Sequence, residues 1–155
     1  MKLRLIVFII SLIGFSAYNY FTNARRDGNG DIVSEGEIDS FALKEGDCFD
    51  STDFTNLTTL PAVPCPDPHD YEVYAVFDIP LPTYESEDVT FGMALDACAE
   101  RFDTFVGTAY EDSKLDILAL YPTLASWQEG DREVACAVYD VDGEKLEGTA
   151  AGLGI

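Results

Sequence analysis

The stretch that decides the fold is EDVTFGMALDACAERFDTFVG, which runs from Glu87 to Gly107. Its apolar side chains return every third or fourth residue, at Phe91, Leu95, Cys98, Phe102 and Phe105. This spacing places them on one stripe of an α-helix. The acidic residues Glu87 and Asp88 suit the positive N-terminal end of that helix, and Gly107 provides a C-terminal stop. The sequence therefore predicts one main helix that buries this stripe against a sheet.

Several segments around this helix have the patterns of β-strands. In Tyr71–Ile79, YEVYAVFDI, apolar residues alternate, so we expect the odd-numbered side chains on one face of a strand. Val134–Val141 is apolar on nearly all its positions and is predicted to be a central strand. Asp142-Gly143 predicts a hairpin turn. Further strands are expected at Phe41–Leu43, Ala62–Val63, Leu115–Tyr121 and, as the edge strand after the hairpin, Lys145–Thr149.

These elements predict the α+β class, with a small, mostly antiparallel sheet and one main helix packed on it. A short additional helix is expected at Thr123–Gly130, capped by Thr123 and ended by Gly130. The predicted organisation is an anchor or signal in residues 1–26, an acidic linker in residues 27–40 and a folded body in residues 41–155.

The chain of 155 residues is strongly acidic, with 9 Lys and Arg against 29 Asp and Glu and a formal net charge of −20. Residues 1–26 hold four basic residues and no acidic one, so residues 27–155 hold five basic against 29 acidic residues, a net charge of −24. Such a body repels the phosphates of nucleic acids and of anionic lipids. We therefore expect no nucleic-acid partner.

Residues 1–26 have the pattern of an export signal or a membrane anchor. A short basic start precedes the apolar run Leu5–Phe15, and extending the run to Phe21 gives about the shortest segment that crosses a ~30 Å hydrocarbon core. The small-residue motifs Gly14–Ser16 and Thr22–Ala24 leave a cleaved signal and a secreted body as the alternative. We favour a retained single-span helix that contacts the membrane and holds the body outside the cytoplasm.

Residues 27–40 are polar, acidic and rich in glycine, which predicts a flexible linker. The order Asp27-x-Asn29-x-Asp31, with Glu37 further on, resembles the ligand spacing of an EF-hand calcium loop. This segment lacks the turn-forming glycine after Asp31, and no amphipathic helix follows it directly. A solvated spacer is therefore the preferred interpretation, and a calcium-dependent binding module is an alternative.

Four cysteines lie in the exported part of the chain, at Cys48, Cys65, Cys98 and Cys136. They form no C-x-x-C motif, which disfavours a zinc site and a thioredoxin-type pair. Of the three possible pairings we favour Cys48–Cys65 with Cys98–Cys136. Cys98 lies on the helix stripe and Cys136 on an apolar strand face, and the other two lie at the edge of the first strands. Disulfides persist outside the cytoplasm.

The single histidine, His69, lies in a proline-punctuated loop beside Asp70 and Glu72. With these carboxylates it has the chemistry of an acid–base or a metal ligand, so an envelope hydrolase that uses His69 is an alternative function. One imidazole without a second imidazole or a free thiolate makes a poor transition-metal site. The preferred interpretation is a histidine that locks the turn, with no metal, no other cofactor and no catalytic residue expected.

A second cluster of notable residues is Trp127, Asp131 and Arg132. A lone tryptophan at a turn either anchors a partner or covers the core, and we prefer the core. Arg132 is one of five basic residues in the acidic body, so we expect it to have a buried or bidentate carboxylate partner.

Five blocks follow one another along the body: Phe41-x-Leu43-x-x-Gly46-Asp47-Cys48-Phe49; Val63-Pro64-Cys65-x-x-Pro68-His69-Asp70-x-Glu72-Val73-Tyr74-Ala75; Cys98 with Arg101-Phe102 and Val106-Gly107; Tyr121-Pro122-Thr123-x-x-Ser126-Trp127-x-x-Gly130-Asp131-Arg132-x-Val134-x-Cys136; and Gly143-x-x-Leu146-x-Gly148-Thr149. Together they resemble the septum-formation domain family of exported actinobacterial proteins. The resemblance implies a domain that is tethered by an N-terminal membrane segment, faces outward and is linked to cell division. It brings no catalytic mechanism, so we expect an interaction or structural domain, not an enzyme, with an envelope or division protein as its partner.

Overall fold

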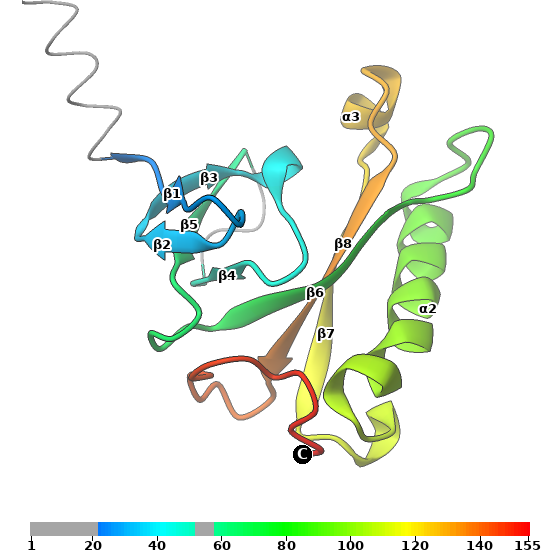
Figure 1. Ribbon diagram of the computed structural model, residues 1–155. Helices are drawn as coiled ribbons and strands as arrows, with labels where there is room; N and C mark the ends of the chain where they lie inside the picture. The colour runs from blue at the N-terminus through cyan, green and yellow to red at the C-terminus, as the bar shows by residue number, and fades with distance from the viewer. Residues whose placement is uncertain (1–21, 52–57) are drawn as a thin grey trace, which may run out of the picture.

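The computed structural model describes residues 22–51 and 58–155. Its centre is a six-stranded antiparallel sheet in the order β3-β5-β4-β6-β8-β7, with the long helix α2 packed on one face (Figure 1). The strands are β1 (Arg25–Arg26), β2 (Ile32–Ser34), β3 (Gly36–Asp39), β4 (Cys48–Phe49), β5 (Thr59–Val63), β6 (Tyr71–Asp78), β7 (Leu115–Leu120) and β8 (Glu133–Asp140). The helices are α2 (Glu87–Val106) and α3 (Leu124–Gln128), with 3₁₀ turns η1 (Ser40–Ala42) and η2 (Tyr110–Asp112). The α+β prediction is confirmed for this part of the chain.

Helix α2 begins and ends as the sequence predicts, but its buried stripe is rotated. The Ser86 side chain accepts a hydrogen bond from the Val89 amide at the N-cap, and Gly107 ends the helix in the left-handed conformation with φ 87°. The buried residues are Thr90, Ala94, Cys98, Phe102 and Val106. Cys98 and Phe102 were predicted correctly, whereas Phe91 is 42% exposed. The Cys98–Cys136 bridge requires the helix to lie close to the sheet. The small side chains of Thr90 and Ala94 therefore face the sheet in the first half of α2, and Phe91 lies at the edge of the contact.

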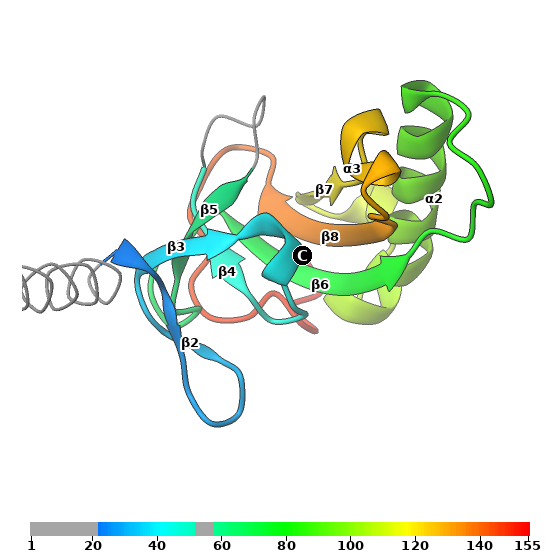
Figure 2. The same ribbon diagram turned by 90° about the horizontal axis from the view of Figure 1, so that it is seen from above.

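Strand β6 does not keep one face buried along its length. Its pairing with β8 shifts register between Val73 and Ala75, which is the signature of a β-bulge. The added residue switches the alternation, so Tyr71 and Val73 pack into one core and Tyr74 and Ala75 into another. The prediction of a single face for all odd-numbered side chains is therefore wrong. The bulge lets β6 connect a core beneath α2 to a second core beneath the N-terminal strands, as Figure 2 shows from above.

Residues 27–40 do not form the predicted flexible linker. Strand β3 pairs with β5, with Ile38 opposite Leu60, and Ile32 of β2 is buried in the same second core. The acidic composition does not predict these strands, because their buried face needs only a few apolar residues and their outward face is charged. The folded body therefore begins at about Arg25, where β1 pairs with β2.

Two other predicted strands are absent from the described residues. Phe41–Leu43 contributes to η1 instead, because the Asp39 side chain accepts a hydrogen bond from the Phe41 amide and starts a turn. Lys145–Thr149 is not an edge strand, because Leu146 makes one isolated bridge to His69. The C-terminal segment is held by scattered backbone hydrogen bonds and by side chains, not by a continuous ladder.

Asp142-Gly143 lies in a turn after β8, but no strand returns from it within the described residues, so the predicted hairpin is wrong. The other strands and the short helix agree with their predictions. β8 lies between β6 and β7 and is buried on both faces, and Thr123 caps α3 in a reciprocal capping box with Ser126. The disulfides are Cys48–Cys65 and Cys98–Cys136, with Cα–Cα distances of 5.2 and 5.6 Å. Within residues 22–51 and 58–155, no helix is long and apolar enough to cross a bilayer. The predicted anchor lies almost entirely outside the described residues.

Candidate functional site

The imidazole of His69 is fully buried and belongs to the framework. One ring nitrogen, Nδ1, lies 2.8 Å from the Asp67 carbonyl oxygen, and because a carbonyl only accepts, Nδ1 carries the proton. The other nitrogen, Nε2, is buried and has no hydrogen-bond partner among the described residues. The His69 backbone exchanges hydrogen bonds of 3.0 and 2.8 Å with Leu146. These contacts are those expected of a histidine that locks the turn, and that role remains a prediction.

The neighbouring carboxylates hold the C-terminal segment in place. The Glu72 side chain is 2% exposed and accepts hydrogen bonds of 2.6 Å from the Thr149 hydroxyl and from the Ala150 amide. The Asp70 carboxylate pairs with Lys145 at 2.8 Å and accepts from the Ser51 hydroxyl. Burial acts to raise the pKa of Asp70, but these hydrogen bonds outweigh it and lower the pKa.

Trp127 lies in the core, as predicted, and is 7% exposed. The guanidinium of Arg132 stacks over the indole at 3.5 Å from the ring centroid, and its Nη1 donates to the carbonyl oxygens of Trp127 and Asp131. Among the described residues these groups take the place of the predicted carboxylate partner, so that prediction is wrong. The reason is local, because the turn after α3 places the carbonyl oxygens of Trp127 and Asp131 within hydrogen-bonding distance of the Arg132 guanidinium.

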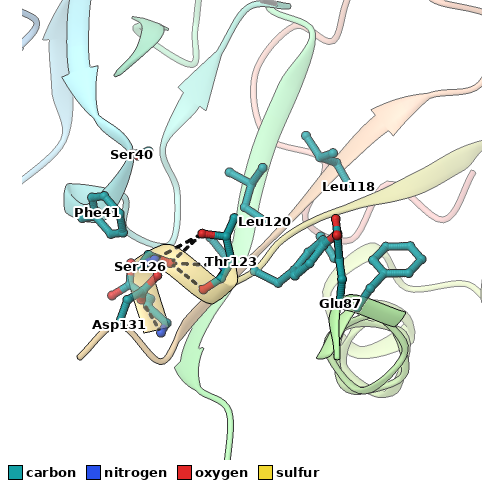
Figure 3. A pocket seen from close by; sticks show the side chains of 13 residues that line it. Ser40, Phe41, Glu87, Leu118, Leu120, Thr123, Ser126 and Asp131 are labelled. Atoms are coloured by element: carbon teal, nitrogen blue, oxygen red, sulfur yellow. Dashed lines mark hydrogen bonds between the residues drawn. The ribbon is translucent and has the colours of Figure 1, made fainter. Parts of the chain in front are cut away.

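A groove with a cavity volume of about 610 Å³ crosses the molecule beside the edge strand β7. Figure 3 shows Phe41, Ser126 and Asp131 on one side, Glu87 on the other, and Leu118 and Leu120 between them. A second hollow of about 440 Å³ shares Phe41, Ser126, Asp131 and Glu133 with the first and adds Asp78, Glu129, Gly130 and Arg132. The two hollows form one groove, which we name the β7 groove.

The β7 groove has an apolar floor and an acidic rim. The first hollow is lined by the carboxylates Glu87, Asp131 and Glu133, and no basic side chain is among the described residues that line it. Burial and the nearby charges of Asp131 and Asp78 raise the pKa of Glu133. The ionised form of Glu133 is therefore destabilised in the folded protein, and a cation bound nearby would reduce this destabilisation.

The possible calcium loop is a hairpin turn. The Asp27 carboxylate accepts hydrogen bonds from the amides of Asn29, Gly30 and Asp31, which close the β1–β2 connection and lower the pKa of Asp27. Glu37 lies in β3, where it pairs with Pro61. No group of three or more His, Cys, Asp or Glu side chains in the described part of the chain is placed to hold a metal ion.

The septum formation family matches this chain over residues 33–136 and 82–151, which together cover most of the fold and both disulfides. The chain belongs to the septum formation family. Searches of curated proteins and of solved structures find no match. The family match begins within β2, in agreement with the structure and not with the predicted linker.

The residues singled out from the sequence of this septum formation domain fall into two places. His69, Asp70 and Glu72 fasten the C-terminal segment, whereas Asp131 and Arg132 line the β7 groove. Sequence reasoning missed the other groove residues, chiefly Phe41, Phe91, Leu118, Leu120, Glu87 and Glu133. One feature of the sequence does indicate the groove. Strand β7, LDILAL, has apolar residues on both faces although it lies at the edge of the sheet, so its second face is expected to pack against another surface.

Proposed function

We propose that this protein is a membrane-tethered interaction domain of the cell envelope that acts outside the cytoplasm in septum formation. The observation that carries the proposal is the family match over a body closed by two disulfides. Disulfides form and persist in oxidising compartments, so the domain is consistent with an extracytoplasmic one. The apolar segment before the body supplies the tether in this proposal.

The β7 groove supports an interaction role. It exposes Phe41 and Phe91 to 57% and 42% beside an apolar floor, and exposed aromatic side chains around a groove are typical of partner-binding surfaces. The hydrolase alternative depends on His69, whose ring is buried and which lines neither hollow. An interaction domain is therefore the function we prefer.

The folded body begins so soon after the apolar segment that little spacer is left between them. Arg26 is fixed to Asp47 by two hydrogen bonds, of which the Nη2–Oδ2 contact is 2.6 Å long, and Asp47 is 3% exposed. If residues up to Phe21 span the bilayer, the body is held directly at the membrane surface. A partner of such a domain would itself lie in or near the membrane.

Imaging in dividing cells tests this function. A full-length copy fused at its C-terminus to a fluorescent protein that matures outside the cytoplasm is expected to concentrate at the division septum. The matched control replaces residues 1–21 with a cleavable export signal and should lose the septal band while keeping the disulfides. An even distribution of the full-length fusion along the envelope, with normal septa in cells that lack the protein, would contradict the septal role.

A further inference from the structure

We propose that the β7 groove binds an extended segment of a partner protein in which apolar side chains are flanked by Lys or Arg. This inference rests on the proposed interaction function and names the chemistry of the partner. Three independent features of the groove lead to it: its apolar surface, its open strand edge and its charge.

The apolar surface favours side chains of Leu, Val or aromatic type. Leu118 and Leu120 point away from the α2 core and are only half-buried, because they pack against the margin of the second core. Phe41 and Phe91 both line the groove and are exposed. Phe91 belongs to α2 together with Glu87, which Figure 3 shows across the groove from Phe41. A volume of about 610 Å³ is in the range of sites that hold ligands of several side chains. Covering this surface removes apolar area from water and so stabilises the complex.

The strand edge favours an extended backbone. The Val141 amide donates to the Lys114 carbonyl, so even-numbered residues of β7 hydrogen-bond to β8 and odd-numbered ones point outward. The outward amides of Leu115 and Ile117 are taken by the side chains of Ser113 and Asp116. The next outward residue, Ala119, lines the groove. No side chain of the described residues accepts a hydrogen bond from the Ala119 amide. The edge is thus closed along its first half and open where the groove lies.

The charge favours a basic segment. Figure 3 shows Glu87 on the α2 side and Asp131 on the side of Phe41, so carboxylates stand at both ends of the apolar floor. Glu133 lines the second hollow together with Phe41 and Asp131. Asp78 and Glu129 continue the acidic rim into the second hollow. Arg132, which is stacked on Trp127 and bonded to carbonyl oxygens, contributes one positive charge against five carboxylates in the two hollows, so the rim stays acidic. Lys or Arg residues flanking the apolar ones would meet these carboxylates.

Selection from a peptide library tests the proposal. The full chain, held in nanodiscs of neutral phosphatidylcholine, is presented to random twelve-residue peptides displayed on phage, and empty nanodiscs remove background binders. The groove variant is Phe41→Ser with Glu133→Gln. The matched control, Val141→Ser with Glu144→Gln, removes one exposed apolar side chain and one exposed carboxylate at the far end of β8.

The enriched peptides are expected to combine apolar residues with Lys or Arg. Their affinity, measured by fluorescence polarisation of synthetic copies, should fall at least tenfold in the groove variant and stay unchanged in the control. Failure to enrich any peptide, enrichment of acidic or wholly polar peptides, or equal affinity for both variants would overturn the proposal. Affinity lost in both variants alike would show general attraction to an acidic surface and would also overturn it. Any of these results with an intact septal band would leave the proposed function standing.

Discussion

At the scale of single residues, the buried carboxylates of Asp47 and Glu72 are hydrogen-bonded. Asp47, 3% exposed, meets Arg26 and the Lys44 amide, and Glu72 meets Thr149 and Ala150. Removing one partner of such a group leaves an uncompensated buried charge, which is among the most destabilising single changes. These carboxylates therefore serve the fold. Glu133 differs, because its nearest charges have the same sign.

The first prediction concerns Glu133→Gln in the free protein. Burial and the carboxylates of Asp131 and Asp78 raise the pKa of Glu133 above 4.5, so folding disfavours the ionised form. The free energy of unfolding therefore falls as pH rises from about 4.5 through the raised pKa. At pH 7 the Gln variant should have a higher Tm than the wild type, by no more than about 3 °C because the side chain is only half-buried and solvent screens its charge.

Thermal unfolding followed by circular dichroism at pH 7 and pH 4 checks this expectation. The difference in Tm should shrink at pH 4, where the wild-type side chain is mostly protonated in both states. The control is Glu144→Gln on the exposed turn after β8, which should be neutral at both pH values. A variant that is less stable at pH 7 would show that Glu133 serves the fold and not the groove.

At the scale of elements, the entry of the chain into the sheet depends on one glycine. Gly36 in β3 has φ +153°, and a Cβ there would lie 2.3 Å from the Ala24 nitrogen. The close approach lets the Ala24 amide donate to the Glu37 carbonyl at 3.0 Å and places Asn23 beside β3. Any side chain at this position would push the N-terminal segment off the sheet.

The second prediction is that Gly36→Ala releases this segment and lowers the free energy of unfolding by about 2 kcal/mol. Trypsin should then cleave after Arg25 and Arg26 faster than in the wild type. Limited proteolysis followed by mass spectrometry measures the rate. The matched control is Gly28→Ala in the β1–β2 turn, where a Cβ meets nothing within 4 Å. Equal cleavage of the two variants would contradict the expected role of Gly36.

The third prediction compares the two disulfides. Cys98–Cys136 closes 38 residues and joins α2 to the central strand, whereas Cys48–Cys65 closes 17 residues within the N-terminal strands. By the loop-entropy model their removal costs about 4 and about 3 kcal/mol. Urea unfolding of the double-alanine variants in detergent measures both losses. An equal or reversed order would mean that native packing, and not loop closure, sets the contribution of each bridge.

At the scale of the whole molecule, two cores share one sheet. The core beneath α2 is closed by Cys98–Cys136, and the core beneath β2 and β3 lies beside Cys48–Cys65. Residues of β6 and β8 contribute to both cores. Figure 2 shows these two strands running from the N-terminal strands to α2. The acidic surface around them keeps the body away from anionic lipid, although the proposed tether holds it close to the bilayer.

The fourth prediction concerns topology. In the full chain, a cysteine at the exposed position Glu144 should react with a membrane-impermeant maleimide in intact cells, because the proposed function places the disulfide-bonded body outside the cytoplasm. Lys2→Cys is the matched control and should react only after lysis. Reaction of Glu144→Cys only after lysis would place the body in the cytoplasm. Labelled protein found only in the medium would show that the N-terminal segment is a cleaved signal.

Local pattern alone determined several parts of this protein. The favoured disulfide pairing was one of three that the sequence allowed, and it is confirmed. The caps of α2 and α3 and the central position of β8 follow from residues close in sequence or from strong periodicity. Each of these features is set by nearby backbone geometry or by the burial of a markedly apolar segment. The family resemblance was likewise available from the sequence and is confirmed.

Only the tertiary structure decided which face of each element is buried. The bulge in β6 and the rotation of α2 depend on how closely the helix and the sheet approach each other. Strands β2 and β3 are positioned by the packing of Ile32 and Ile38 in one core with Phe49 and Leu60. The β7 groove has the same origin. Its walls come from η1, α2, α3 and β7, which are far apart in the chain, so no local pattern brings Phe41, Phe91 and Glu133 together.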